Sequence, residues 1–190
     1  MEVKIGVSNR HIHLKQEHVD ILFGLNYELT KDRDLYQPNT YASKEYLIIK
    51  TDKDSIPHVR VLGPVRKYTQ VEISKTDAYK LGINPPIRTS GIIDGTSPIT
   101  LIGPAGTVEL TEGCILANRH IHLTYNDLKR LDLEGVKTVS VKVGGVKGGM
   151  MDNVYLKTSD DYVLEMHIDT DDANGHLLKT DDLVTLIKGH

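Results

Sequence analysis

The pentapeptide RHIHL occurs twice in this chain, at residues 10–14 and again at residues 119–123. Similar residues lead into the two copies, Val-Ser-Asn before the first and Leu-Ala-Asn before the second. A stretch with helical features follows each copy. The apolar residues of 16–23 recur at helical spacing, and Thr124 is a typical N-cap for a short helix over YNDLKRLDL. The duplication therefore predicts two related halves.

A second, weaker correspondence extends the duplication. The segment VEISKTDAYKLG (71–82) aligns without gaps with MHIDTDDANGHL (166–177), and the alignment sets Glu72 opposite His167. Each half then supplies a His-X-His pair and one further side chain that can bind a metal. The candidate ligands are His11, His13 and Glu72 in the first half, and His120, His122 and His167 in the second.

Short strands dominate the rest of the chain. Apolar runs or alternation predict strands at residues 46–50, 58–62, 99–102, 138–143 and 162–166, with Gly and Pro between them. Many short strands with few helices indicate a mainly β protein, built of barrels or sandwiches with small helical caps. The chain has no low-complexity tract and no long linker, so we expect the halves to pack together with a site between them.

Composition excludes several classes of function. A chain of 190 residues can form one large domain or two small ones, and its formal charge of −3 gives no basic footprint for nucleic acid. The single cysteine, Cys114, allows no intramolecular disulfide, and we expect it to be a small buried residue. The sequence has no apolar run of membrane-spanning length, and its first residues predict a strand and no signal peptide. We expect a soluble, cytoplasmic protein without membrane partners.

The repeated histidines favour a metal site. In a strand, His-X-His places both imidazoles on one face and turns the residue between them, Ile12 or Ile121, toward a core. Zinc is the default metal for such a site, and three protein ligands leave the open position typical of catalytic zinc. Glu72 would complete one ligand set or bridge two ions, and Ser8 and Asn9 are candidates for hydrogen bonds to the histidines. The alternative is that duplication merely copied histidines that stabilise the fold.

Other segments are candidates for binding anions. Arg66 precedes Glu72 by six residues, and a guanidinium there could hold phosphate through paired hydrogen bonds. From this residue alone, an ordinary surface arginine is the more common case. The stretch RTSG (88–91) contains Ser90 and is either an anion-contacting loop or a turn. The glycine-rich stretch 144–149 fits neither the dinucleotide-binding nor the P-loop pattern and predicts a flexible loop.

Four segments, VSNRHIHL, LGPVRKYTQVEIS, ANRHIHL and EMHIDTDDAN, carry a family resemblance. In this order they resemble the PduL-type phosphate propanoyltransferases, the phosphotransacylases found with propanediol- and ethanolamine-degrading microcompartments. The resemblance spans about residues 3–187. It implies an enzyme that reversibly converts a short-chain acyl-CoA, propanoyl-CoA or acetyl-CoA, and inorganic phosphate into acyl phosphate and coenzyme A.

The resemblance also implies a fold and a site. One β-barrel domain would be discontinuous, formed by residues 1–10 plus 118–190, and residues 11–117 would form the other, each capped by short α-helices. Two zinc ions would lie at the interface of the domains, held by the six candidate ligands, and Arg66 would contact phosphate. Members sent to microcompartments often carry an N-terminal extension, for which there is no room ahead of Ser8. We therefore expect a cytoplasmic enzyme, or a microcompartment enzyme if a targeting extension has been removed from this sequence. We also expect coupling to acetate or propionate kinase and allow for a homodimer.

We expect phosphate to attack the thioester directly, without an acyl-enzyme, because neither Cys114 nor Ser90 lies in a nucleophile–base motif. Ser90 would instead donate a hydrogen bond to phosphate or to the thioester. The residues alone leave two alternatives. One is a dinuclear metallohydrolase acting on a phosphoester or amide. The other is a non-catalytic β-barrel binding module that is stabilised by zinc.

Overall fold

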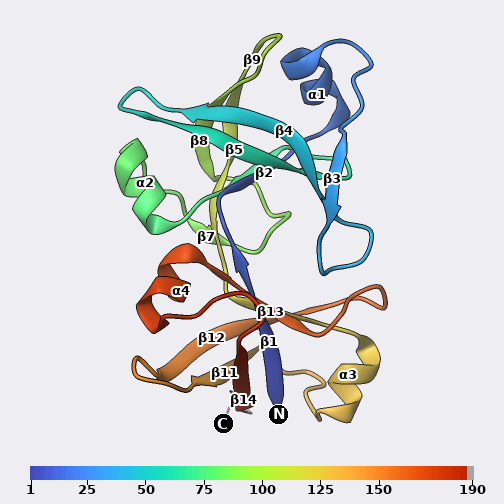
Figure 1. Cartoon of the computed structure of the whole chain (residues 1–190), viewed down its shortest axis with the longest axis vertical. Coiled ribbons are helices and arrows are strands. Elements are labelled where there is room, and N and C mark those ends of the chain that lie inside the picture. Colours follow the sequence, from blue (N-terminus) through green and yellow to red (C-terminus); the bar gives the residue numbers. More distant parts are fainter. Residues whose placement is uncertain (188–190) are drawn as a thin grey trace. The chain divides into compact units, whose positions relative to one another are not determined.

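The computed structural model describes residues 1–187, and these form two compact units (Figure 1). Asn9–Ala117 form one, which we call the inserted unit. Met1–Ser8 together with the chain from Asn118 onward form the other, the discontinuous unit. Both are mainly β, and the described residues contain fourteen strands and four short helices.

The elements of each unit follow the chain. The inserted unit contains β2 (His11–His13), α1 (Gln16–Phe23), β3 (Lys31–Asp34), β4 (Tyr41–Lys50), β5 (Ser55–Gly63), β6 (Gln70–Glu72), α2 (Lys75–Leu81), β7 (Ile87–Arg88), β8 (Ser97–Ile102) and β9 (Thr107–Ala117). The discontinuous unit contains β1 (Glu2–Ser8), β10 (His120–Leu123), α3 (Tyr125–Arg130), β11 (Thr138–Val143), β12 (Gly149–Thr158), β13 (Glu165–Asp169), α4 (Thr170–His176) and β14 (Leu183–Ile187).

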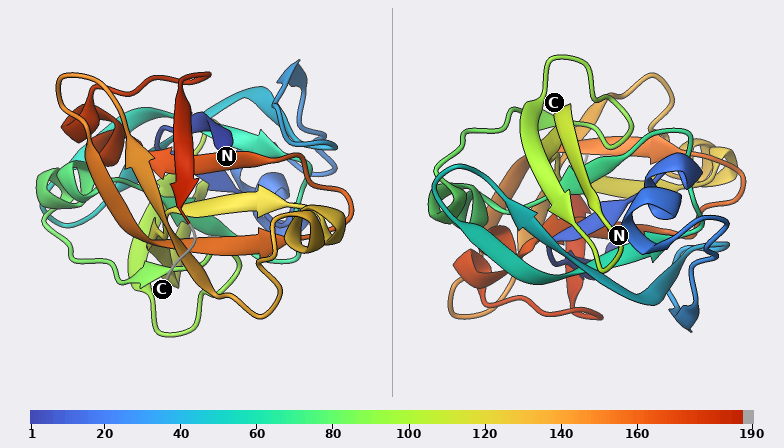
Figure 2. Two further views of the ribbon diagram at one scale, coloured as in Figure 1. Left: turned by 90° about the horizontal axis from the view of Figure 1, so that it is seen from below. Right: turned by 90° about the horizontal axis from the view of Figure 1, so that it is seen from above.

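Each unit contains a closed barrel of six strands. In the discontinuous unit the order is β1-β13-β10-β12-β11-β14, and β14 pairs with β1 to close the ring. In the inserted unit β4, β5, β2, β6 and β9 are successive neighbours, and β8 closes the ring because it pairs with both β9 and β4. Figure 2 shows the strands of the two units in two further views. The predicted duplicated β-barrel fold with short helices is confirmed.

The same pairing pattern surrounds both His-X-His strands. β2 lies between β5, which is parallel to it, and β6, which is antiparallel. β10 lies in the same way between parallel β12 and antiparallel β13. Equivalent strands therefore occupy equivalent places, as the duplicated sequence predicts.

The strand that leads into each motif belongs to the other unit. β1 ends at Ser8 in the discontinuous unit, where it pairs with β13 and β14, and the chain then enters β2 of the inserted unit. β9 ends at Ala117 in the inserted unit, where it pairs with β6 and β8, and the chain then enters β10. The two units have thus exchanged one strand each relative to the repeats in the sequence.

Each barrel has its own apolar core, and the His-X-His strands contribute to both. Ile12 and Ile121 are fully buried members of the cores of the inserted and the discontinuous unit. Burial of a side chain of this size stabilises the fold by about 1.5–3 kcal/mol. Since side chains alternate along a strand, the histidines that flank each isoleucine point out of the barrel. This confirms the prediction that these isoleucines face a core.

The local predictions were correct for most elements. α1 has the predicted bounds, and α3 begins after Thr124, whose hydroxyl accepts a hydrogen bond from the Asp127 N–H. The predicted strand at 162–166 is wrong at its start, because β13 begins at Glu165 and Tyr162 belongs to a turn closed onto Ser159. No helix among residues 1–187 combines the length and the apolar character needed to cross a membrane.

Glu45 of β4 is a buried carboxylate that ties the β4 strand to the segment before β3. It is 7% exposed, and it accepts hydrogen bonds from the Tyr27 hydroxyl (2.9 Å) and from the Thr30 N–H (3.0 Å). Burial by itself raises the pKa of Glu45, but hydrogen bonds from Thr30, Ser43 and Tyr27 outweigh burial, and the pKa is lowered. A carboxyl with a lowered folded-state pKa stabilises the fold above its unfolded pKa, about 4.3, and this contribution is lost as the pH falls through the folded value.

We expect Glu45→Gln to lower the free energy of unfolding by about 1–3 kcal/mol at pH 7, because a charged acceptor of several hydrogen bonds is lost. The difference from the unchanged protein should shrink as the pH falls below the unfolded pKa of about 4.3 and through the lowered folded pKa of Glu45. Urea unfolding at pH 7 and pH 3 measures both values, and Glu109→Gln on an exposed position of β9 is the control. A loss of stability that is the same at both pH values would contradict this role.

Candidate active site

The first metal-capable cluster lies on β2 and β6 of the inserted unit. The antiparallel register places His11 directly across from Glu72. Ligand atoms of His11, His13 and Glu72 all lie within 4.8 Å of one another, and His11 Nε2 lies 3.5 Å from Glu72 Oε2. Two imidazoles and one carboxylate at this spacing form a donor set suited to a divalent transition metal.

The second cluster lies on β10 and β13 of the discontinuous unit. Ligand atoms of His120, His122 and His167 also lie within 4.8 Å of one another. The register places His120 across from His167, as it places His11 across from Glu72. The structure therefore brings together the three candidate ligands of each half, and Glu72 and His167 occupy equivalent positions, as the sequence alignment set them.

A backbone carbonyl orients the first histidine of each motif. His11 Nδ1 lies 2.8 Å from the Asn9 carbonyl oxygen, and His120 Nδ1 lies 2.8 Å from the Asn118 carbonyl oxygen. A carbonyl only accepts hydrogen bonds, so Nδ1 carries the proton and Nε2 keeps a lone pair that is available to a metal. The Asn9 side chain does not make this bond to His11, because its Oδ1 accepts a hydrogen bond from the Arg10 N–H. The bonds to the histidines come from main-chain atoms, which no residue type signals.

Ser90 is connected to the cluster of the inserted unit through Gln70. Gln70 is fully buried on β6, and its Nε2 donates to Glu72 Oε1 (2.6 Å) and to Ser90 Oγ (2.9 Å). The Gly91 N–H in turn donates to Gln70 Oε1 (2.8 Å). Sequence reasoning missed Gln70, although its position two residues before Glu72 places both side chains on one face of β6.

Arg66 lies in the loop between β5 and β6, next to the turn that carries Ser90. Its N–H donates to the Leu14 carbonyl, directly after β2 (2.8 Å), and its Nη1 donates to the Tyr68 hydroxyl (3.0 Å). That hydroxyl oxygen also lies 3.3 Å from where a Cβ on Gly91 would be. The two candidate anion-binding residues, Arg66 and Ser90, are thus near each other around Tyr68 and Gly91.

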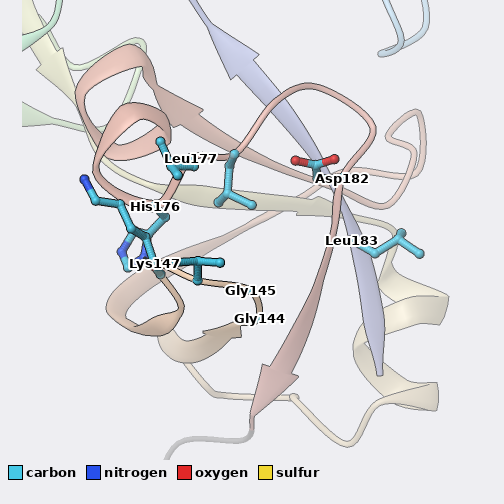
Figure 3. A pocket seen from close by; sticks show the side chains of 9 residues that line it. Gly144, Gly145, Lys147, His176, Leu177, Asp182 and Leu183 are labelled. Carbon is cyan, nitrogen blue, oxygen red and sulfur yellow. Dashed lines mark hydrogen bonds between the residues drawn. The ribbon is translucent and has the colours of Figure 1, made fainter.

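The glycine-rich segment is the hairpin between β11 and β12, and it lines a separate pocket of about 330 Å³ (Figure 3). Lys147 of the hairpin and His176 at the end of α4 lie side by side there, and His176 Nδ1 is 2.9 Å from the Lys147 carbonyl oxygen. Leu177 and Asp182 complete part of the wall. None of the candidate metal ligands lines this pocket.

The arginine of each RHIHL motif forms a matching ion pair with a helix. Arg10 Nε and Nη2 contact Asp77 Oδ1 of α2 at 2.9 and 2.8 Å. Arg119 contacts both carboxylate oxygens of Asp172 in α4, at 2.7 and 2.8 Å. The two aspartates hold equivalent positions in the aligned segments. The repeated arginine therefore holds the His-X-His strand to the helix that follows the third candidate ligand.

We expect Asp77→Asn to lower the free energy of unfolding by about 1–3 kcal/mol, since Asp77 is 4% exposed and loses its charged hydrogen bonds to Arg10. Asp52→Asn, at an exposed position of the same unit, should have little effect. Thermal and urea unfolding of both variants provide the measurement. Equal stabilities of the two variants would show that the Arg10–Asp77 pair does not hold β2 to α2.

The fold and the paired clusters define a duplicated β-barrel protein with two candidate metal centres. A model of the family "Phosphate propanoyltransferase" matches residues 4–179. The chain belongs to this family, and it is therefore an acyltransferase, as the four sequence motifs predicted.

Several relatives carry the name "Phosphate propanoyltransferase". The protein of Thermotoga maritima is 46% identical over 97% of this chain and 88% of its own length. The protein of Lachnoclostridium phytofermentans is 45% identical over 97% of this chain and 87% of its own length. The protein of Rhodopseudomonas palustris is 44% identical over 98% of this chain and 83% of its own length. These relatives favour the acyltransferase over the metallohydrolase and over the non-catalytic binding module.

Proposed function

We propose that this protein transfers a short acyl group, propanoyl or acetyl, reversibly between coenzyme A and inorganic phosphate, and that zinc occupies both clusters. The relatives named phosphate propanoyltransferase support the substrates. The observation that carries the proposal is the repeated three-donor cluster, found at the same strand register in both units. We propose further that the reaction needs both clusters.

The donor sets fit zinc. One cluster offers two imidazoles and a carboxylate, and the other offers three imidazoles. His11 and His120 each keep a lone pair on Nε2, because Nδ1 donates to a backbone carbonyl. Three protein donors leave a position for a ligand from solution, as in catalytic zinc sites. Bound zinc would act as a Lewis acid that stabilises negative charge on phosphate and carbonyl oxygens.

Arg66 would bind a phosphate oxygen. Its guanidinium donates one hydrogen bond to the Tyr68 hydroxyl, which leaves further N–H groups for a paired contact with an anion. The bond from the Arg66 N–H to the Leu14 carbonyl holds its loop to the segment directly after His13. Arg66 is therefore fixed to the strand that carries two of the candidate ligands, and it would orient phosphate relative to them.

Ser90 would donate a hydrogen bond to the reacting groups. Its Oγ accepts a hydrogen bond from Gln70 Nε2, so its own proton is directed to another acceptor. A phosphate oxygen, or the thioester carbonyl oxygen on which charge develops, is the acceptor we assign to it. A positioned donor of this kind lowers the barrier most when it meets the charge of the transition state.

The transfer would be direct. A phosphate oxygen forms a bond to the carbonyl carbon, the carbon–sulfur bond breaks, and coenzyme A leaves as the thiolate. The one thiol of the chain, Cys114, is fully buried on β9, and burial raises its pKa to about 12, so it is a poor nucleophile at neutral pH. Positioning two bound substrates is itself worth roughly 7–11 kcal/mol in favourable cases.

The test is release of coenzyme A from propanoyl-CoA and from acetyl-CoA, with and without phosphate. We expect release that depends on phosphate and that yields one acyl phosphate for each thiol. Release at the same rate without phosphate would indicate a hydrolase and would overturn the proposal. Incubation with radiolabelled acyl-CoA alone, followed by denaturation, checks the direct route, because label retained on the protein would establish an acyl-enzyme.

A further inference from the structure

Gln70 forms the fourth corner of the cluster in the inserted unit. The register of β2 and β6 places His11 across from Glu72 and His13 across from Gln70. Side chains two residues apart share one face of a strand, so all four point to the same side of the sheet. Gln70 is fully buried and its amide donates to Glu72 Oε1 over 2.6 Å. An amide donor therefore holds the carboxylate that is the third candidate ligand.

Glu165 forms the equivalent corner in the discontinuous unit. The register of β10 and β13 places His120 across from His167 and His122 across from Glu165. Glu165 is 5% exposed, and its Oε2 lies 2.6 Å from His167 Nε2. An ionised carboxylate only accepts, so the proton lies on Nε2 of His167 and its Nδ1 keeps the lone pair. A carboxylate acceptor therefore holds the imidazole that is the third candidate ligand.

The supporting residue changes together with the ligand it supports. Where the ligand is the carboxylate of Glu72, the support is an amide that donates, and where it is the imidazole of His167, the support is a carboxylate that accepts. Each group of four also contains one acidic side chain, at the ligand corner in one unit and at the supporting corner in the other. Between the two units, both the ligand and its supporting residue differ, yet the hydrogen bond between them and the number of acidic side chains stay the same.

Gly6 of β1 provides the space for the pair of Glu165 and His167. The parallel register of β1 and β13 sets Gly6 beside His167. A Cβ on Gly6 would lie 2.7 Å from Glu165 Oε1 and 3.0 Å from His167 Cδ2. Gly6 lies inside the regular strand β1, so its backbone does not need the conformational freedom of glycine. Glycine is needed there because a side chain would occupy the space of Glu165 and His167.

We infer that Gln70 and Glu165 are equivalent positioning residues, each of which orients the third ligand of its cluster for metal binding. The inference rests on the proposed binding of zinc by the two clusters. Both residues act through a ligand and not on the substrate. A partner that fixes the orientation and proton position of a ligand before metal arrives typically contributes about 10–100-fold to metal affinity.

The first test compares zinc affinities of wild-type protein and Glu165→Gln by competition with a chromophoric chelator. We expect one of the two ions to bind about 10–100-fold more weakly in the variant, and the other to bind as before. Glu134→Gln, the same chemical change at an exposed position of the same unit, is the control. Gly6→Ala should weaken the same ion without changing any polar group, because the added methyl displaces Glu165. Circular dichroism confirms that each variant is folded.

The second test replaces Glu165 and His167 by the residues found at the equivalent positions of the inserted unit, Gln70 and Glu72. His167→Glu places two carboxylates two residues apart on β13, whereas the double variant Glu165→Gln/His167→Glu reproduces the side chains of the inserted unit. We expect the double variant to bind zinc about tenfold more tightly than His167→Glu alone, a rescue that a merely structural Glu165 would not give. Unchanged affinity in Glu165→Gln, or a double variant that binds no more tightly than the single one, would overturn the inference. Wild-type protein that binds no zinc would overturn the proposed function, and the inference with it.

Discussion

The His120→Ala variant should lose phosphate-dependent release of coenzyme A by more than about 1000-fold and should hold one zinc ion fewer than the wild type. The variant removes one of three donors that lie within 4.8 Å of one another. A metal supplies several kcal/mol of charge stabilisation in the transition state, and each 1.4 kcal/mol corresponds to a tenfold change in rate. Elemental analysis and the release assay measure the two effects.

The control for His120→Ala is His176→Ala, which removes an imidazole from the same unit but outside the cluster. His176 lines the separate pocket beside the hairpin of β11 and β12. This control should keep both ions. If His120→Ala kept full zinc content and full activity, the second cluster would have no part in the reaction.

The second large effect is expected for Arg66→Ala. We expect the ratio kcat/KM for phosphate to fall by about 100–1000-fold while both zinc ions stay bound, because the lost group stabilises the charge of phosphate and not the metal. Arg66→Lys should recover only part of the loss, since an ammonium group keeps the charge but not the planar fork of a guanidinium. Initial rates at varied phosphate, with zinc content measured on the same samples, provide the comparison.

Lys67→Ala removes the neighbouring exposed cation and is the control for a general effect of charge. It should leave the dependence on phosphate nearly unchanged. An unchanged phosphate dependence in Arg66→Ala would contradict the assignment of Arg66 to phosphate. Loss of zinc from Arg66→Ala would instead mean that Arg66 acts through the metal cluster.

Local and repeated patterns in the sequence predicted much of the fold and the grouping of the candidate ligands. His-X-His within apolar surroundings predicted strands with Ile12 and Ile121 in the cores, because the two-residue alternation of a strand is a local property. The gapless alignment of two segments predicted the equivalence of Glu72 and His167, because duplication preserves strand register.

The exchange of β1 and β9 between the units was not predictable from the residues alone. β1 directly precedes β2 of the inserted unit but pairs with β13 of the discontinuous unit. β9 directly precedes β10 of the discontinuous unit but pairs with β6 of the inserted unit. Strand pairing depends on contacts between segments far apart in the sequence, so hydrophobic periodicity does not reveal it. The alternation of 162–166 likewise did not show where β13 begins.

The residues that we propose to support the two clusters were not predicted, for another reason. Gln70 and Glu165 occupy equivalent positions but differ in chemistry, so no identical residue marks them in the two repeats. Their match becomes visible only when each is seen beside its ligand, Glu72 or His167. The backbone carbonyls that orient His11 and His120 have no sequence signal at all.

The most direct test of the central claim is to remove the metal by chelation and to add zinc back stepwise while measuring phosphate-dependent release of coenzyme A. Each barrel has its own apolar core, so the metal-free protein should keep its β-sheet signal in circular dichroism. We predict that activity stays low until the second equivalent of zinc per chain is bound and is complete when both clusters are filled. Full activity at one equivalent, or in the metal-free protein, would contradict the account.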